Sequence, residues 1–300
     1  MSVYFKVNED GCLDSIEHAG CITIPDGIKS IGARVFRYCR KLSGIIIPGS
    51  VTSIGDWAFR GCTSLANVTL GDNIKSIGEF AFADCSSITS IDIPDSVTSL
   101  KRAAFFKCTN LAHVKIGNGI TSIENCVFRN CRKLTDVSIP DSVTRIGQSA
   151  FSHCPSLKSI VIPDSVQCIW RGAFCHCSSL TDITIPDSVE VIGLWAFKGC
   201  RSLERVLLGS CVQSIGDRAF YECTSLTDIN IPDSVVSIGS EAFARCYSLR
   251  SITIPDSIKH IAGWAFYDCK NLKSIVIPSH FTDEDVVSWW LPDTCKVIRR

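Results

Sequence analysis

The sequence has no long apolar run. Asp, Ser, Lys or Arg recurs every few positions, so no stretch approaches the roughly 18 uninterrupted apolar residues of a membrane-spanning helix. The N-terminal segment MSVYFKVNEDG lacks a basic region followed by an apolar core, and acidic residues already stand at positions 9 and 10. We therefore expect no secretory signal and no integral membrane segment, which favours a cytoplasmic location.

The sequence also lacks an excess of charge of either sign. It contains 30 Lys and Arg and 30 Asp and Glu, which gives a formal net charge of zero and a sequence pI near 6.9. No global electrostatic field draws such a chain to nucleic acid or to anionic lipid, and we expect neither as a partner. Hydrophobic residues make up 46% of the chain, which is enough apolar material for a continuous core.

Cysteine, by contrast, is abundant and regularly spaced. Eleven of the 18 cysteines follow one another at intervals of 23 residues, from Cys39 to Cys269. A phenylalanine stands three residues before each of these cysteines and a leucine three residues after it, with Ile88 as the single exception. Self-similarity at a period of roughly 20 to 50 residues indicates a solenoid, and about 23 residues is typical of leucine-rich repeats.

The unit at residues 180–202 shows how each coil is expected to begin. Leu180, Ile183 and Ile185 give the L-x-x-L-x-L opening of a leucine-rich repeat, and the alternation of Ile183 and Ile185 predicts a strand. Pro186 ends this strand because it has no N–H to donate to a neighbour. The Asp-Ser pair that follows favours a turn.

The rest of the same unit predicts how the coil closes. Val189 and Ile192 are expected to point into the core from a second short strand, and the spacing of Ala196, Phe197 and Cys200 predicts a short helical turn. The fold class is therefore an α/β repeat solenoid of about 12 stacked coils.

We expect one domain with capped ends, because the terminal coils of a solenoid would otherwise expose the core. Residues 1–21 are expected to form an N-terminal cap, as a hairpin or a degraded half-repeat. Residues 22–281 form the repeats, and residues 282–300 a C-terminal cap with a short helix and a final strand. Thr282 and Asp285 have the spacing of a helix capping box.

The repeat IPDSVxxIGxxAFxxCxSLxxI resembles the BspA-like leucine-rich repeats, also called the Treponema pallidum type. The motif is seen in residues 231–249, where the Ile-Pro-Asp-Ser-Val segment is followed by Ile238-Gly239, Ala242-Phe243, Cys246 and Leu249. The match covers residues 22–281. The resemblance implies the leucine-rich-repeat fold, adhesin-like binding of host matrix or other cells, and a cell-surface or secreted location.

The regularly spaced cysteines are interpreted as structural. Cysteine is a small and usually buried residue, and parallel side chains in one column do not aim sulfur at sulfur. We therefore expect free thiols. Cys12 and Cys21, which lie outside the column, are left as a possible pair in the N-terminal cap.

His153, Cys175 and His176 form, with Cys154 and Cys177, the densest group of metal-ligating residue types. Zinc needs about four ligands that converge, whereas Cys154 and Cys177 are expected to face inward and the two histidines outward. We expect no metal and no cofactor, with a zinc site as the alternative to a solvated histidine pair.

Aromatic residues recur two positions before the core phenylalanine, at Trp57, Phe80, Trp195 and Trp264. Packing over the closing turns is favoured for this column over recognition of a partner. Trp170 and Trp195, on neighbouring coils, are kept as candidate recognition residues.

The exposed positions of the first strand of each coil are the more usual recognition surface of a leucine-rich repeat. Aspartates gather in the column just before the strand hydrophobes, which suits a basic peptide or protein. The candidate partner-binding residues on this surface are Asp136, Asp182, Thr184, Arg205, Asp228 and Asn230.

These features predict a non-catalytic protein-binding scaffold or adhesin-like module with a protein or peptide partner. The alternative is a structural protein that assembles into arrays, although capped ends favour a monomer. An enzyme is not expected, because the uninterrupted period leaves no insertion that could shape a catalytic pocket.

Overall fold

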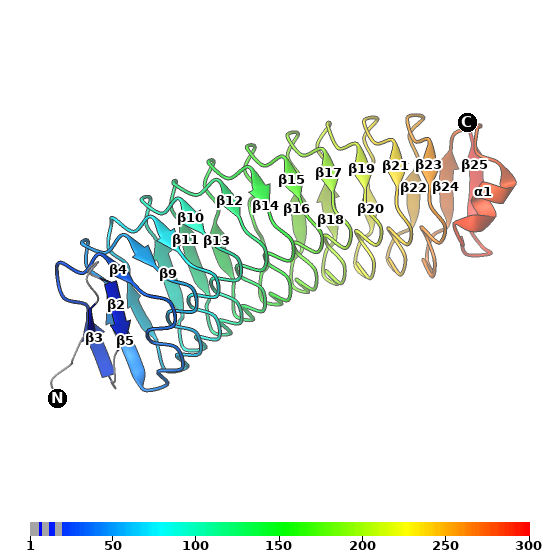
Figure 1. Cartoon of the computed structure of the whole chain (residues 1–300). Coiled ribbons are helices and arrows are strands. Elements are labelled where there is room, and N and C mark those ends of the chain that lie inside the picture. The colour runs from blue at the N-terminus through cyan, green and yellow to red at the C-terminus, as the bar shows by residue number, and fades with distance from the viewer. Residues whose placement is uncertain (1–5, 8–11, 16–19) are drawn as a thin grey trace. The chain divides into compact units, whose positions relative to one another are not determined.

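Strands of successive coils pair in parallel, and their partner residues lie 23 positions apart (Figure 1). Asp182 of β16 (Asp182–Thr184) aligns with Arg205 of β18 (Arg205–Leu207), and the short strands follow the same rule. The register confirms the leucine-rich-repeat solenoid. The computed structural model describes residues 6–7, 12–15 and 20–300. The chain divides into two compact units, residues 1–143 and 144–300. The expected single domain stays a prediction.

In residues 1–143, the short strands β2, β4, β6, β8 and β10 lie side by side in that order, and β1 pairs with β2 antiparallel. The longer strands form two further sheets, β3-β5-β7 and β9-β11-β13. The strands of this unit are β1 (Lys6–Val7), β2 (Cys12–Ser15), β3 (Gly20–Thr23), β4 (Ser30–Ile31), β5 (Leu42–Ile46), β6 (Ser53–Ile54), β7 (Asn67–Thr69), β8 (Ser76–Ile77), β9 (Ser90–Ile93), β10 (Ser99–Leu100), β11 (His113–Ile116), β12 (Ser122–Ile123) and β13 (Asp136–Ser138).

In residues 144–300, the short strands β14, β15, β17, β19, β21 and β23 are neighbours in that order, and the longer strands form the sheets β16-β18-β20 and β22-β24-β25. The remaining elements of this unit are β14 (Arg145–Ile146), β15 (Cys168–Ile169), β17 (Val191–Ile192), β19 (Ser214–Ile215), β20 (Asp228–Ile229), β21 (Ser237–Ile238), β22 (Ser251–Thr253), β23 (His260–Ile261), β24 (Ser274–Ile277), α1 (Asp283–Ser288) and β25 (Lys296–Arg299).

The phenylalanine column forms the centre of the core in both units. The rings are fully buried and stack nearly parallel, for example Phe36 on Phe59 at 4.9 Å between centroids and Phe197 on Phe220 at 5.5 Å. Because each coil repeats the same ring at the same place, the stack buries apolar surface that one coil could not cover alone.

The cysteines spaced at 23 residues make hydrogen bonds that the sequence did not predict. Nine buried thiols donate a hydrogen bond to the phenylalanine carbonyl of the preceding coil, as from Cys62 Sγ to Phe36 O at 2.9 Å and from Cys200 Sγ to Phe174 O at 3.2 Å. Burial raises the pKa of the Cys200 thiol, and that of Cys177 to about 12. No disulfide joins any of the 17 cysteines whose side chains are described. They include Cys21, which does not support a bridge to Cys12, whose side chain lies outside the described residues.

The segment that closes each coil differs from the helical turn that the sequence predicts. It consists of hydrogen-bonded turns, in which Trp195 and Gly199 adopt left-handed conformations with φ of 61° and 72°. Their N–H groups donate to the carbonyls of Asp217 and Tyr221 in the next coil, at 2.9 and 2.7 Å. Between them, the N–H groups of Ala196 and Lys198 donate within the segment at 3.1 Å, so bonds to the next coil alternate with bonds inside the turn. Within residues 6–7, 12–15 and 20–300, α1 is the only helix.

The helix α1 lies over the last coil of residues 144–300 (Figure 1). It begins after Thr282, whose side chain accepts from Asp285 N–H in a capping box. Trp289, directly after the helix, is fully buried, donates from its indole to Ile261 O at 3.2 Å, and accepts from Phe266 N–H through its carbonyl at 3.1 Å. It lies 23 residues after Phe266 and so continues the phenylalanine column. None of the described helices is long and apolar enough to cross a membrane.

Candidate functional site

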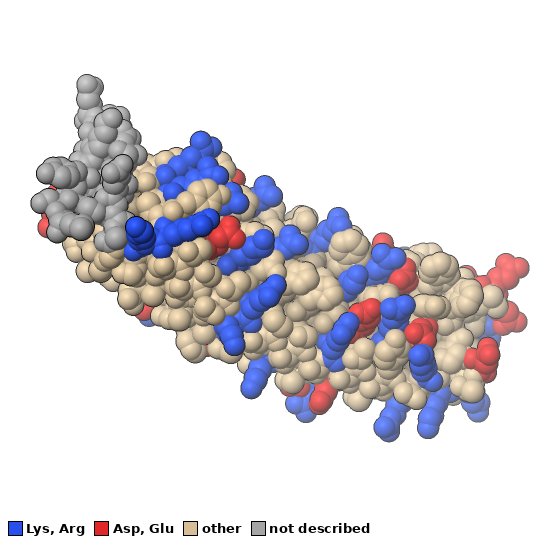
Figure 2. Space-filling view, turned by 90° about the horizontal axis from the view of Figure 1, so that it is seen from below, with Lys and Arg blue, Asp and Glu red and all other residues tan. Residues whose placement is uncertain are grey.

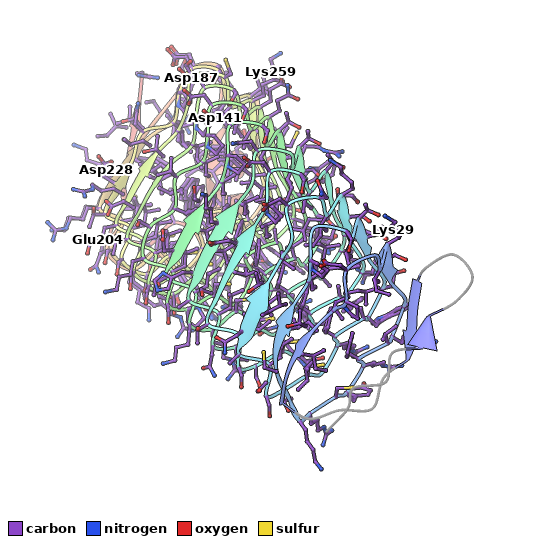
Figure 3. The ribbon with its side chains drawn as sticks, turned by 90° about the vertical axis from the view of Figure 1, so that its left-hand side faces the viewer. Lys29, Asp141, Asp187, Glu204, Asp228 and Lys259 are labelled. Carbon is purple, nitrogen blue, oxygen red and sulfur yellow. The ribbon has the colours of Figure 1, made fainter. Side chains whose placement is uncertain are left out.

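The exposed side chains of β16, β18 and β20 form a continuous row, which we call the strand face. Asp182 aligns with Arg205, and Arg205 aligns with Asp228, on three consecutive strands. Alternation along each strand buries Ile183, Val206 and Ile229 and leaves the residues beside them at the surface. Figure 3 shows Asp228 on one side of the coils and Asp187, at a Pro-Asp-Ser corner, at the top.

Charges on the strand face partly compensate each other. Arg205 Nε donates to Asp182 Oδ1 at 2.5 Å, and this hydrogen bond holds the pKa of Asp182 below its usual value and raises the pKa of Arg205. Both side chains are well exposed, so the pair contributes little to stability. The acidic patch expected from the sequence is therefore, at this place, a row of alternating charge.

Uncharged residues adjoin the charged row. Thr184 is exposed and aligns with Leu207, whose side chain is 63% exposed although it is apolar. Asn230 is exposed and follows directly after β20. The strand face thus offers an apolar anchor beside charged and hydrogen-bonding groups.

Asp136, the remaining strand candidate, lies in the other unit on β13. It aligns with His113 of β11, and Asp136 Oδ2 lies 3.9 Å from His113 Nδ1, with both side chains well exposed. The structure therefore joins Asp182, Arg205 and Asp228 in one row and places Asp136 in a separate arrangement.

Residues 1–143 also contain a pocket that the sequence analysis missed. Its volume is about 350 Å³, and it lies where β9 ends, beside Asp92, which aligns with Lys115 of β11. The lining residues are Leu70, Asp72, Asp92, Ile93, Pro94, Asp95, Ser96 and Lys115. One signal was available: Gly71 and Gly117 replace the proline of the repeat on the coils either side, and a Cβ at Gly71 would lie 2.6 Å from Pro48 O.

The two tryptophan candidates have different surroundings. Trp170 follows β15 and is 51% exposed. Trp195 is half-buried, with the guanidinium of Arg171 4.2 Å above its ring and Lys198 Nζ at 5.6 Å. Its indole N–H is buried without a hydrogen-bond partner. Cations cover the ring of Trp195, whereas Trp170 offers much of its surface to solvent.

His153 and His176 stack at 4.6 Å between ring centroids, which confirms that they are spatial neighbours. Cys177 points into the core and donates to Phe151 O at 3.2 Å. Burial and the nearby Lys198 lower the pKa of His176, and a neutral imidazole suits a stacked pair. In the part of the chain that the structure describes, no group of three or more His, Cys, Asp or Glu residues could hold a metal ion.

Comparison with protein families identifies one repeat type along nearly the whole chain. The family model described as BspA type leucine rich repeat region (6 copies) matches residues 11–135, 103–223 and 196–285. None of the curated proteins matches this chain.

Three solved structures with similar folds come from bacteria. A leucine-rich repeat protein from Bacteroides ovatus is 25% identical with a TM-score of 0.60, and the alignment covers 99% of this chain and 98% of that one. A leucine rich cell surface protein from Faecalibacterium prausnitzii is 30% identical with a TM-score of 0.52, covering 98% of both chains. The pneumococcal vaccine antigen PcpA is 19% identical with a TM-score of 0.61, covering 99% and 91%, and is similar in fold alone.

Proposed function

Because this chain belongs to the BspA type leucine-rich-repeat family, we propose that it is a non-catalytic scaffold that binds a protein or peptide partner through the strand face. The observation that carries the proposal is the aligned row of Asp182, Arg205 and Asp228 beside the exposed Leu207. Strand alternation leaves Leu207 at the surface beside charged and hydrogen-bonding groups, where a partner can bury it.

The arrangement predicts the chemistry of the partner. An apolar side chain of the partner packs on Leu207, while basic and acidic groups pair with Asp228 and the Asp182–Arg205 pair. Thr184 and Asn230 supply hydrogen bonds at the edge. In residues 1–143, basic groups of a partner pair with Asp136 or enter the pocket beside Asp92. Trp170 is an additional exposed side chain on which a partner can pack.

We further propose an adhesin-like role at a cell surface. The support is the relative from Faecalibacterium prausnitzii, which is described as a cell surface protein and matches over 98% of this chain. Labelling of intact source cells with a membrane-impermeant amine reagent, followed by recovery of this chain, tests the location. Labelling only after lysis contradicts it.

Photo-crosslinking tests the strand face directly. A photoreactive residue in place of Leu207 is expected to capture one discrete partner from the native source, and the same residue in place of Asp233, at a Pro-Asp-Ser corner, is expected not to. The variant Asp182→Arg with Asp228→Arg reverses two charges of the row and should abolish the crosslink at position 207.

A matched control keeps the charge change and moves it off the strand face. Asp164→Arg with Asp233→Arg alters two exposed corner aspartates of the same unit and is expected to leave capture unchanged. Equal crosslinking at positions 207 and 233, or capture that survives reversal of Asp182 and Asp228, refutes the strand face as the binding surface. Sedimentation of the purified chain tests the expected monomer.

A further inference from the structure

The closing turns of residues 1–143 carry a concentration of positive charge that the zero net charge of the chain conceals. We call this surface the cationic turn face and define it by the residues 33–41, 56–64, 79–87, 102–110 and 125–133. These segments contain ten Lys and Arg but only three Asp and Glu. Figure 2 views the side opposite the corners at the top of Figure 3, and Lys and Arg outnumber Asp and Glu on it.

The corresponding turns of residues 144–300 provide an internal comparison. There the equivalent segments hold six Lys and Arg and four Asp and Glu, and four of the six cations form ion pairs within the turns. An example is Arg218 with Glu241 at 2.6 Å. On the cationic turn face only Arg60 has such a partner, Asp84 at 3.5 Å, among the described residues. The repeat therefore folds with most of its turn cations paired, and the unpaired cations of residues 1–143 are not needed for folding.

Aromatic rings hold several of these cations in place. The guanidinium of Arg34 lies 4.8 Å from the ring centre of Trp57, and Arg60 and Arg102 lie 5.6 and 5.8 Å from that of Phe80. Trp57 and Phe80 stack on each other at 6.5 Å. Such contacts fix a guanidinium by its face and leave its N–H edge to donate, so less side-chain entropy is lost when an anion binds.

The same field acts on Tyr38. A hydrogen bond from Arg37 and the charges of Arg37 and Arg60 hold the pKa of the Tyr38 hydroxyl below its usual value. A tyrosine with a lowered pKa is what an uncompensated positive surface produces, because the field favours the negatively charged form.

The backbone of the turns limits the class of ligand. The N–H groups of Trp57, Phe59 and Gly61 already donate to carbonyls of the next coil, at 2.8, 2.7 and 2.8 Å. No strand edge is therefore offered to an added peptide strand at these turns. The faces of Trp57 and Phe80 are occupied by each other and by arginines, so nucleobases have little ring surface on which to stack. Exposed Ser64 and Asn110 lie among the cations and suit hydroxyl-rich ligands.

We propose that the cationic turn face binds a linear anionic polysaccharide, whose carboxylate or sulfate groups pair with arginines on several coils. Coils follow one another at about 4.8 Å, the spacing of paired strands, so a chain lying along the stack meets cations on four of the five coils and passes the coil of residues 79–87, which has none. Its hydroxyl groups bond to the polar side chains between them. This binding goes beyond the proposed protein interaction, since it uses a different surface.

Binding of the full chain to heparin, hyaluronate and neutral dextran in solution tests the proposal. Heparin is expected to bind at about 0.15 M salt and dextran not to bind. The triple variant Arg37→Gln, Arg102→Gln and Arg132→Gln removes three exposed cations. Since the salt slope for a single-stranded polyanion is about 0.7 per ion contact, the loss of three contacts lowers the slope by about 2 and raises Kd at least tenfold.

The control variant Arg145→Gln, Lys158→Gln and Arg250→Gln removes three exposed cations from the other unit and should change Kd less than about twofold. Thermal melting of both variants confirms that they fold. Heparin binding alone identifies sulfate as the recognised group, and binding of hyaluronate as well extends it to carboxylate; both outcomes support the proposal. Absence of heparin binding, equal loss in the control, or tighter binding of single-stranded DNA or polyglutamate overturns it.

Discussion

Replacement of Trp289 by alanine should open the C-terminal end of the solenoid without unfolding the rest of its unit. Trp289 is fully buried, and its ring packs edge-on against Phe281 at 5.1 Å between centroids. Burial of roughly 150 to 250 Å² of tryptophan surface at about 25 cal/mol per Å² corresponds to about 4 to 6 kcal/mol. The change also leaves Ile261 O without the indole donor, at a further cost of about 1 kcal/mol.

The neighbouring residue provides a control of the same type. Trp290 is 56% exposed and touches Trp264 and Tyr267 at 6.4 and 6.1 Å between centroids. Trp290→Ala removes a tryptophan at the same end of the chain but loses only surface contacts, so we expect a cost of about 1 kcal/mol or less.

Hydrogen exchange measured by mass spectrometry distinguishes local from global opening. The amides of Trp264 and Phe266 donate to Ser288 O and Trp289 O, so in Trp289→Ala they should exchange much faster. Amides of β14 to β17 should be unchanged, because each coil is stabilised by its neighbours. A uniform rise in exchange over residues 144–300, or an equal effect in Trp290→Ala, would refute the nearest-neighbour reasoning.

Three further predictions concern thiols, the helix cap and a crowded turn. Iodoacetamide at neutral pH should label Cys21 and Cys211, which are exposed, and spare Cys200, whose thiol pKa burial raises; labelling of Cys200 in the native protein contradicts this. The Asp285 carboxylate has a lowered pKa because it accepts hydrogen bonds from the Thr282 N–H and hydroxyl. Its contribution to the stability of α1 is therefore present above the pKa of an unfolded aspartate and is lost as pH falls through the lowered value. Faster hydrogen exchange in α1 at low pH measures this loss. Gly199→Ala should lower the free energy of unfolding by at least about 1 kcal/mol, because the residue has a positive φ and its Cβ would lie 2.5 Å from His176 Nδ1; chemical denaturation measures this, and a neutral result contradicts it.

Sequence periodicity was sufficient to predict the coil, because the phenylalanine, leucine and strand positions each have one environment in every repeat. It was insufficient for the closing turn. Trp57, Phe80 and Glu241 have side chains that favour a right-handed conformation, yet all three have positive φ. Hydrogen bonds to the next coil impose that conformation, and such bonds depend on stacking rather than on local sequence.

The candidate site was predictable in part for a similar reason. Column positions showed that Asp182, Arg205 and Asp228 would be neighbours on the surface, and the structure aligns them. The pairing of Asp182 with Arg205 depends on side-chain direction, and the pocket beside Asp92 depends on how closely two coils approach. The cationic turn face was not predicted, because the net charge of a sequence does not show on which side of the coil each charged residue lies.

The left-handed positions of the closing turns have a consequence for how such proteins diversify. Every repeat has two of them, and their occupants range from glycine and alanine to arginine, glutamate, histidine and tryptophan. Since the ladder between coils sets the backbone there, the fold accepts many different side chains, each at a conformational cost relative to glycine. Mutation can therefore change the chemistry of the turn surface one coil at a time, and new binding specificities can arise on a scaffold that does not have to be rebuilt.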